Sequence, residues 1–221
     1  MILLASKSSG RLATLRAAGV EPLVRVSSVD EETVLGELIR GRRDAGLPAP
    51  SAAEQVQALA RAKALDVMTS TDPQEAEVVV GCDSMLEIAG QVVGKPADAA
   101  QARERWRMMS GGTGTLHTGH FLVRTADGTT AEGVSSATIR FGSPSPAEVE
   151  AYIASGEPLW CAGAFTIDGL GGAFIEGIDG DPHGVVGISL PLLRRLLAAL
   201  GVVWTDLWAP PPATKPVDDA H

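Results

Sequence analysis

Five charged residues in the first hundred positions have the chemistry of a site for phosphate compounds. Two are acidic, Glu31 and Asp83, and three are basic, Arg11, Lys63 and Lys95. Carboxylates bind hard divalent cations through oxygen. Cations neutralise phosphate charge, and a carboxylate or a metal ion can activate water. Metal-assisted hydrolysis of a phosphate compound needs this combination.

Taken singly, each of these residues has a simpler interpretation. An Asp after a buried strand is usually a turn or a cap, and a Lys on a helix is usually solvated. The acids at 30–32 fit a solvated turn, and residues 6–9 fit a capping loop. Lys63 is less ordinary, because it follows Leu59 by four residues and Val56 by seven, and so shares the apolar side of its helix. The residues alone predict an α/β enzyme with a phosphate site.

Strands and helices in the first half of the chain must position these groups. Residues 2–5 predict a strand, followed by a polar loop and a helix that Gly19 ends. Ser6 and Ser8 then lie at a helix N-terminus, where backbone N–H groups favour anions. Residues 23–29 predict a strand that leads into the acids, and residues 41–51 predict a loop. A helix over 52–67 carries Lys63. A buried strand over 77–81 ends at Asp83, so both acids are expected at strand ends.

The second half of the chain predicts alternating strands and helices. A hairpin is expected over 85–93, a helix from 98 to about 110, paired strands over 115–124 and 130–141, and a capped helix from 145 to about 156. Residues 163–187 are rich in glycine and acids, and predict strands and loops that face the site. Residues 188–200 predict a final apolar helix.

Composition and charge limit the classes of function. The chain has 221 residues, of which 45% are hydrophobic and 20% charged, as in globular proteins that bury a core. A net charge of -9 argues against binding to nucleic acid polymers and to anionic membranes. A small anion still fits if local cations or a metal hold it. There is no basic leader and no apolar run of about 18 residues, so we expect a cytoplasmic protein with no membrane partner.

Several familiar signatures are absent. Cys82 and Cys161 form no zinc spacing and are interpreted as free thiols. The run SGGTGTLH lacks the Lys-Ser/Thr ending of a P-loop, and there is no dinucleotide fingerprint or nucleophile elbow. His117 and His120 belong to no metalloprotease pattern and are interpreted as strand residues and not as metal ligands.

A series of short motifs in one order resembles the Maf family. The motifs are Leu4-Ala5-Ser6-Lys7-Ser8-Ser9-Gly10-Arg11, Asp30-Glu31, Leu59-Ala60-Arg61-Ala62-Lys63-Ala64, Gly81-Cys82-Asp83-Ser84, Gly94-Lys95-Pro96, Ser110-Gly111-Gly112-Thr113, Thr118-Gly119, and a glycine-rich segment over 162–171 that continues through Glu176, Gly180-Asp181 and Val185-Val186-Gly187. Each motif alone is unspecific, but their number and order over residues 3–207 are specific.

The resemblance implies a fold and an activity. The fold would be α/β, with a mixed, strongly twisted sheet flanked by helices and a deep central cleft, as in the inosine triphosphate pyrophosphatases. One domain would span residues 1–208, and residues 209–221 would form a disordered tail. The activity would be hydrolysis of nucleoside triphosphates between the α- and β-phosphates, giving monophosphate and pyrophosphate and removing non-canonical nucleotides. A homodimer is a further expectation from the family.

The resemblance also implies roles for particular residues. Asp83 would be the proton acceptor or a metal ligand, and Glu31 would share the metal, Mg²⁺ or Mn²⁺. The triphosphate would be bound by Arg11, Lys63 and Lys95, with Ser6 and Ser8 donating hydrogen bonds from the first loop.

Six positions depart from the family pattern and leave the preferred base open. The family has Pro where Ser9 stands, Arg where Gly10 and Gly112 stand, His at Gly114, Lys at Cys161 and, in members that favour dTTP and UTP, Gln at Asp168. These losses of cations and donors keep a second hypothesis open, a nucleotide-binding regulator of septum formation and cell division with little turnover. A third is a phosphatase or nucleotidyl transferase, which a different product would reveal.

Overall fold

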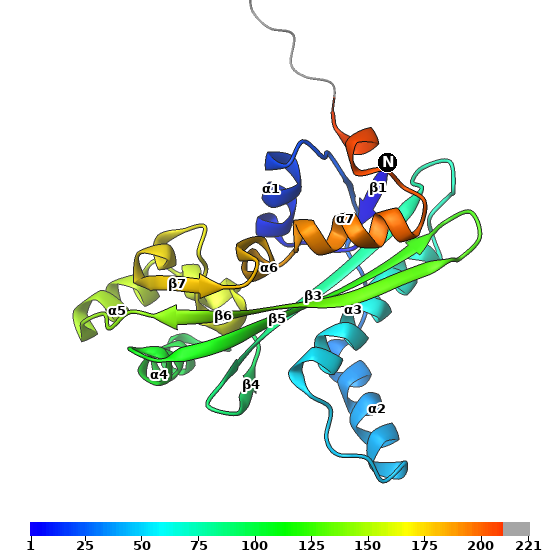
Figure 1. Cartoon of the computed structure of the whole chain (residues 1–221). Helices are drawn as coiled ribbons and strands as arrows, with labels where there is room; N and C mark the ends of the chain where they lie inside the picture. The colour runs from blue at the N-terminus through cyan, green and yellow to red at the C-terminus, as the bar shows by residue number, and fades with distance from the viewer. Residues whose placement is uncertain (210–221) are drawn as a thin grey trace, which may run out of the picture.

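A seven-stranded mixed sheet forms the centre of the computed structural model, which describes residues 1–209 (Figure 1). The strand order is β2-β1-β3-β5-β6-β7, and β4 pairs with β3. β1 runs parallel to β2 and β3, and the other pairs are antiparallel. The strands are β1 Ile2–Leu4, β2 Leu23–Val24, β3 Val78–Ile88, β4 Gln91–Val93, β5 Thr113–Arg124, β6 Thr130–Phe141 and β7 Ile175–Asp179.

Helices flank the sheet on both faces. α1 and α7 lie on one side of the long strands, and α2 and α3 lie on the other (Figure 1). The helices are α1 Ser9–Ala17, α2 Glu31–Asp44, α3 Ala52–Met68, α4 Ala99–Met109, α5 Pro146–Ala154, α6 Pro182–Val186 and α7 Leu190–Ala199. Short 3-10 helices are η1 Glu157–Trp160, η2 Ala162–Ala164, η3 Leu170–Phe174 and η4 Trp204–Leu207. The expected fold class is therefore confirmed.

Local sequence accounts for several element boundaries. α3 begins with a capping box, in which Ser51 accepts from the Glu54 amide and the Glu54 carboxylate accepts from Ser51. α5 begins in the same way at Ser145. The β3–β4 hairpin turns through Ala89 and Gly90, at φ 49° and 75°, which is the left-handed pair that a tight two-residue hairpin requires.

Two glycines allow α3 to lie directly on the sheet. A Cβ at Gly81 would stand 2.8 Å from the Ala64 nitrogen and closer still to the Ala60 carbonyl. A Cβ at Gly119 would stand 2.8 Å from the Gln57 nitrogen. Only glycine permits this approach. α4 packs on the opposite face, further along the strands, where Trp106 joins the core cluster of Leu86 and Leu116.

The segment between β2 and α3 differs from the expectation. The strand predicted over 23–29 is only two residues long, and residues 31–44 form α2, which was not predicted. Asp30 accepts a hydrogen bond from the Glu32 amide and so caps this helix. Acids in the first turn and Arg42 and Arg43 in the last turn complement the helix dipole. The loop expected at 41–51 therefore begins only at residue 45.

The positions of both acids also correct the expectation. β3 does not end near Asp83 but continues to Ile88, because β5 pairs with it residue for residue, including Asp83 with Gly119. Glu31 is the first residue of α2. Neither acid lies at a strand end. In the glycine-rich segment 163–187, β7 is the single named strand, and α6 and two 3-10 helices form much of the remainder.

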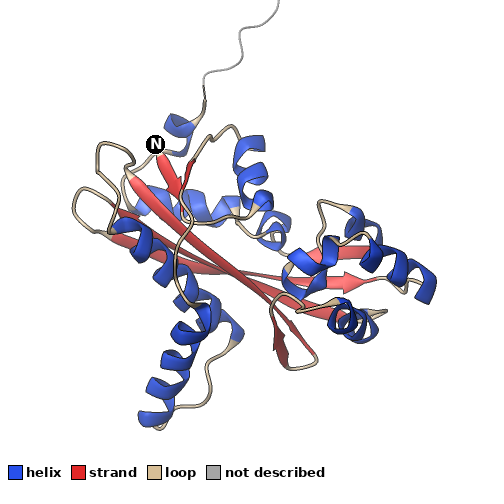
Figure 2. Cartoon of the chain, turned by 180° about the vertical axis from the view of Figure 1, so that it is seen from behind, coloured by secondary structure: helices blue, strands red, loops and turns tan. Residues whose placement is uncertain are grey.

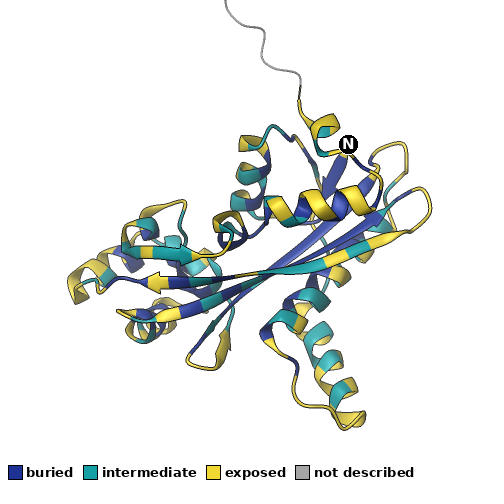
Figure 3. Ribbon diagram, in the orientation of Figure 1, coloured by how far each residue is buried: buried dark blue, intermediate teal, exposed yellow. Residues whose placement is uncertain are grey.

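The other predicted elements are confirmed within a few residues. These are β1 with α1, α3, the β3–β4 hairpin, α4, β5 with β6, α5 and the final helix α7 (Figure 2). The middle of the sheet is buried, whereas no residue of α2 is buried (Figure 3). Among residues 1–209, no helix has the length and apolar character to cross a membrane. The tail expected at 209–221 lies, from residue 210 on, outside the described residues.

Candidate functional site

Glu31, Lys63 and Asp83 meet at one point. The Lys63 ammonium nitrogen lies 2.7 Å from Glu31 Oε1 and 2.6 Å from Asp83 Oδ1. The side chains of Lys63 and Asp83 are 14% and 11% exposed, while that of Glu31 is 55% exposed. One cation thus joins two carboxylates at the border between buried and solvent-accessible space.

Three elements contribute one residue each to this cluster. Asp83 points from β3 toward α3, because alternate residues of a strand face opposite sides and Gly81, two residues earlier, contacts α3. Lys63 lies on the side of α3 that faces the sheet, as its spacing from Leu59 predicts. Glu31 enters from the first turn of α2, which packs beside α3 through Val34 and Leu35.

Burial sets the proton affinity of Asp83. Removal from water raises the pKa of the Asp83 carboxyl above its ordinary value, because burial disfavours the charged form. The Lys63 and Arg11 cations oppose this rise. A carboxylate with a raised pKa, beside a cation that favours its ionised form, is suited to accept a proton.

Arg11 forms a second cluster on the other face of β3. Its guanidinium donates to Gly187 O at 2.7 Å, to Ser6 Oγ at 3.0 Å and to Ser84 Oγ at 3.1 Å. Ser84 in turn lies 2.8 Å from Thr118 Oγ1. A guanidinium has five N–H donors, so these bonds fix Arg11 and leave further N–H groups for an anion.

The two clusters meet where the edge of β3 is open. β1 pairs with β3 as far as Val80, and β4 pairs with it from Leu86 onward. Between these positions, in the described part of the chain, β3 has β5 on one side and no strand on the other. Ligands at this gap can reach Asp83 from one face and Arg11 from the other.

Ser6 and Ser8 of the first loop lie beside Arg11. Ser6 Oγ accepts from Arg11 and from the Ser8 amide at 3.2 Å, and Ser8 Oγ caps α1 by accepting from the Arg11 amide at 3.4 Å. Both hydroxyl hydrogens therefore remain able to donate to a ligand.

Lys95 stands apart from these clusters. It is exposed and follows β4, two residues beyond Val93, which pairs with Leu86. Within residues 1–209 its ammonium makes no ion pair, and its charge acts on Cys161, whose pKa is raised by burial to about 11. The structure thus brings together Glu31, Lys63 and Asp83, and Arg11 with both serines, but not Lys95.

The carboxylates fit a hard divalent cation only as a pair. No group of three or more His, Cys, Asp or Glu residues in the described region could hold a metal by itself. Mg²⁺ commonly uses one or two carboxylates and completes its shell with water and substrate phosphates. Glu31 and Asp83, already arranged around one positive charge, match that donor set.

Two departures from the family pattern lie away from Asp83. Gly114 is buried on the opposite face of the sheet, where a Cβ would stand 3.0 Å from Leu86 Cδ1. A Cβ at Gly10 would stand 3.1 Å from Val186 Cγ1 and 3.6 Å from Asp168 Oδ2. The Glu31–Lys63–Asp83 cluster is therefore intact despite both changes.

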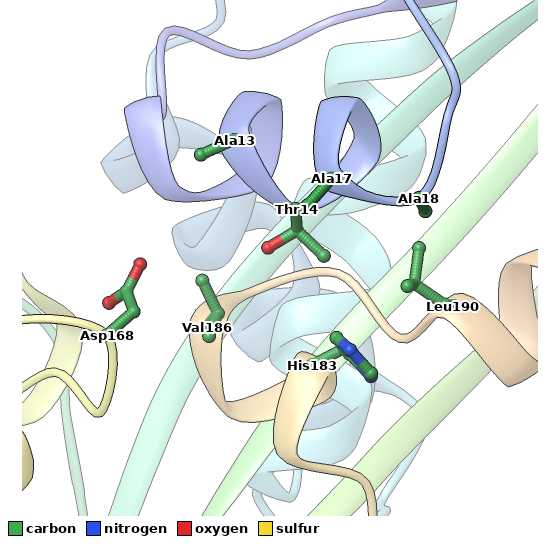
Figure 4. A pocket seen from close by; sticks show the side chains of 8 residues that line it. All are labelled: Ala13, Thr14, Ala17, Ala18, Asp168, His183, Val186 and Leu190. Atoms are coloured by element: carbon green, nitrogen blue, oxygen red, sulfur yellow. The ribbon is translucent and has the colours of Figure 1, made fainter. Parts of the chain in front are cut away.

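A surface pocket of about 360 Å³ lies between α1 and the α6–α7 segment (Figure 4). Ala13, Thr14 and Ala17 form one wall, with His183 and Asp168 near the others. A second pocket, of about 380 Å³, lies beside Trp204. Neither is lined by Glu31, Lys63 or Asp83, so the deep cleft expected at the charged site stays a prediction.

Sequence reasoning gave no role to two groups that hold Arg11, the Ser84 hydroxyl and the Gly187 carbonyl. It also gave none to Thr118, which contacts Ser84. Ser84 and Thr118 belong to motifs of the family, but the motifs did not indicate which contacts these residues make. The Gly187 contact joins residues 176 positions apart and has no local signal.

Comparison with known proteins agrees with these motifs. Residues 1–200 match the family model described as Maf-like protein. The chain belongs to the Maf family. It is 50% identical over 209 residues to a Streptomyces coelicolor protein named nucleoside triphosphate pyrophosphatase, covering 95% of both chains. Proteins of the same name from Mycobacterium sp. (strain JLS) and Rhodococcus jostii are 49% and 51% identical, each over 212 residues. These alignments cover 94% and 93% of this chain, and 97% and 95% of the relatives.

Proposed function

We propose that this Maf chain hydrolyses nucleoside triphosphates to nucleoside monophosphate and pyrophosphate. Full-length similarity to relatives with that name supports the reaction class. The single observation that carries the proposal is Lys63, whose ammonium joins the carboxylates of Glu31 and Asp83 beside a fixed Arg11. Two cations and two carboxylates at one gap in a sheet suit a substrate with several phosphates and a water to be activated.

Each residue has a proposed task. Arg11, held by Ser6 and Ser84, binds phosphate oxygens through its remaining N–H groups. Lys63 neutralises charge on the phosphates. Asp83 accepts the proton of the attacking water, for which its raised pKa suits it. Ser6 and Ser8 donate from the first loop, and Lys95 binds the substrate from the β4 side.

Glu31 and Asp83 would hold Mg²⁺ or Mn²⁺ together with the substrate. When bound, such a cation neutralises phosphate charge and lowers the pKa of water. Lys63 contacts both carboxylates, so it would release part of this contact to phosphate as the substrate and cation arrive.

A product assay tests the proposal. Canonical and modified nucleoside triphosphates are incubated with the protein, with Mg²⁺ or with EDTA, and the phosphorus products are identified. We expect pyrophosphate and monophosphate in Mg²⁺ only. Orthophosphate or a transferred nucleotide would indicate the third hypothesis. Binding without turnover would indicate the regulator.

The remaining expectations accompany this proposal. We infer one domain over residues 1–208 built around the gap in β3, a cytoplasmic location and a homodimer. Removal of non-canonical nucleotides is the proposed purpose, and the same product assay ranks the bases.

A further inference from the structure

Three polar residues, Glu87, His117 and Ser136, lie in a row on the sheet face that carries Asp83. Met85, His117 and Ser136 pair in register across β3, β5 and β6, one step beyond the Asp83–Gly119 pair that α3 covers. His117 therefore faces the same side as Asp83. Glu87 follows Met85 by two residues and faces this side as well. Ser136 is exposed, and the Glu87 side chain is 43% exposed, so a ligand can reach this face.

The imidazole of His117 links Ser136 to Glu87. His117 Nδ1 lies 2.8 Å from Ser136 Oγ. His117 Nε2 is buried and has no hydrogen-bond partner, and it lies 3.6 Å from Glu87 Oε2. When the Ser136 hydroxyl donates to Nδ1, Nε2 carries the hydrogen and points it at the carboxylate. A small shift of Glu87 then completes a hydrogen-bonded line from Ser136 through His117 to Glu87, and this line fixes the orientation of the Glu87 carboxylate.

We propose that Glu87 accepts a hydrogen bond from the ribose 2′-hydroxyl of the substrate, and that His117 positions this carboxylate. The site would thereby favour ribonucleotides over 2′-deoxyribonucleotides. This inference rests on the proposed function, because it takes Asp83 as the place of the reacting phosphate.

Electrostatics sets the direction of the substrate. Arg11 and Lys63 contact Ser84 and Asp83 in the middle of β3, and they attract the triphosphate. Glu87 lies four residues further along, roughly 13 Å from Asp83 between Cα atoms at the usual strand rise. Its negative charge repels phosphate, and its carboxylate oxygens can only accept hydrogen bonds. A nucleotide with its α-phosphate beside Asp83, separated from it by a water or a cation, therefore turns its uncharged sugar toward Glu87.

The chemistry of Glu87 suits a sugar hydroxyl. A carboxylate that binds a ribose hydroxyl is a recurrent device in nucleotide-binding folds. A hydrogen bond from a hydroxyl to a charged acceptor is worth about tenfold to a hundredfold in affinity. A metal is a poorer match for this row, because the described residues supply only one acid and one histidine here.

Paired substrates test the inference. We would measure kcat and KM for UTP and dUTP, and for GTP and dGTP, with the native chain and with Glu87→Ala and His117→Ala. The native chain should favour each ribonucleotide by about tenfold or more. Glu87→Ala should remove most of that preference through KM and leave the deoxy substrates unchanged. His117→Ala should reduce it, and His117→Gln, which keeps an N–H near Nε2, should restore it in part.

A matched control separates this row from the α1–α6 pocket. His183→Ala alters a histidine of that pocket and should leave the ribo/deoxy ratio unchanged. Equal losses on both sugars in Glu87→Ala, an unchanged ratio, or a ratio that responds to His183→Ala would overturn the inference.

Binding measurements keep the inference separate from the proposed function. Affinities of α,β-imido-UTP and its 2′-deoxy counterpart are compared by calorimetry, which needs no turnover. A native chain that releases no pyrophosphate but still prefers the ribo analogue through Glu87 would refute the activity alone. Turnover with no sugar preference would refute the inference alone.

Discussion

At the scale of single residues, the central feature is a lysine between two carboxylates. Lys63 favours the ionised form of Asp83, whereas burial favours the protonated form and has the larger effect. Because the pKa of Asp83 is raised, its base form is lost on acidification at a higher pH than for an ordinary carboxyl group near 3.9. We therefore expect kcat/KM, which reports the ionisation of the free enzyme, to fall as pH decreases through that raised pKa. A pH profile of kcat/KM measures it.

A variant at Lys63 tests whether Asp83 causes this loss of activity at low pH. Lys63→Met removes the cation that opposes the effect of burial on Asp83, so the pKa of Asp83 should rise further and the fall of kcat/KM should begin at a higher pH. A fall at the same pH in both proteins would show that another group controls it.

At the scale of elements, the site depends on how closely α3 approaches the sheet. Gly81→Ala places a methyl group against the Ala60 carbonyl and the Ala64 nitrogen, so α3 must move and carry Lys63 away from Asp83. Overpacking of this kind costs about 1–3 kcal/mol. We expect a corresponding loss in the free energy of unfolding, measured with urea, together with reduced turnover.

Gly41→Ala is the matched control for this substitution. Nothing lies within 4 Å of a Cβ at Gly41, which is exposed on α2. This change should leave stability equal or raise it by up to about 1 kcal/mol through helix propensity. Equal behaviour of the two variants would contradict close α3 packing as a requirement.

A buried histidine connects β5 to the start of α7. His120 Nε2 accepts from the Ser189 amide at 2.9 Å, and burial lowers the pKa of His120 from 6.5 to about 4. Between these values the unfolded chain binds a proton that the folded chain does not. Stability should therefore decrease as pH falls from about 6.5 to about 4, by on the order of 3 kcal/mol. Above pH 6.5 the full contribution of neutral His120 to the free energy of unfolding is present.

Urea unfolding at pH 7 and pH 5 tests this linkage. His120→Gln removes the titrating group, so the variant should lose less stability than the native chain between the two conditions. Parallel losses in both proteins would assign the acid sensitivity to other groups.

At the scale of the whole molecule, periodicity and caps predicted most elements. The cap at Ser145 and the Ala89-Gly90 turn are local signals, and their elements appear where expected. α2 was missed because its acids fit a turn and its apolar residues Val34 and Leu35 are only partly buried. Asp83 was misplaced at a strand end because pairing with β5, a non-local interaction, extends β3 through polar residues.

The candidate site was predictable in composition but not in geometry. Motif order selected Glu31, Lys63 and Asp83, and the structure brings them into contact. Two contacts depend on packing between distant segments: Lys63 joins the two acids, and Arg11 binds Gly187 O on the other face of β3. No spacing in the sequence encodes such contacts.

Asp83→Asn tests the central claim most directly. The substitution keeps the shape of the side chain and an oxygen for Lys63, but removes the proton acceptor. Pyrophosphate release is compared with the native chain and with Asp66→Asn, which alters a half-buried carboxylate of α3 that accepts from Ser28. We predict that Asp83→Asn lowers kcat by a factor of about 10² to 10⁴ and leaves the melting temperature unchanged. Asp66→Asn should keep native turnover. A loss of less than about tenfold in a folded Asp83→Asn protein would contradict the account.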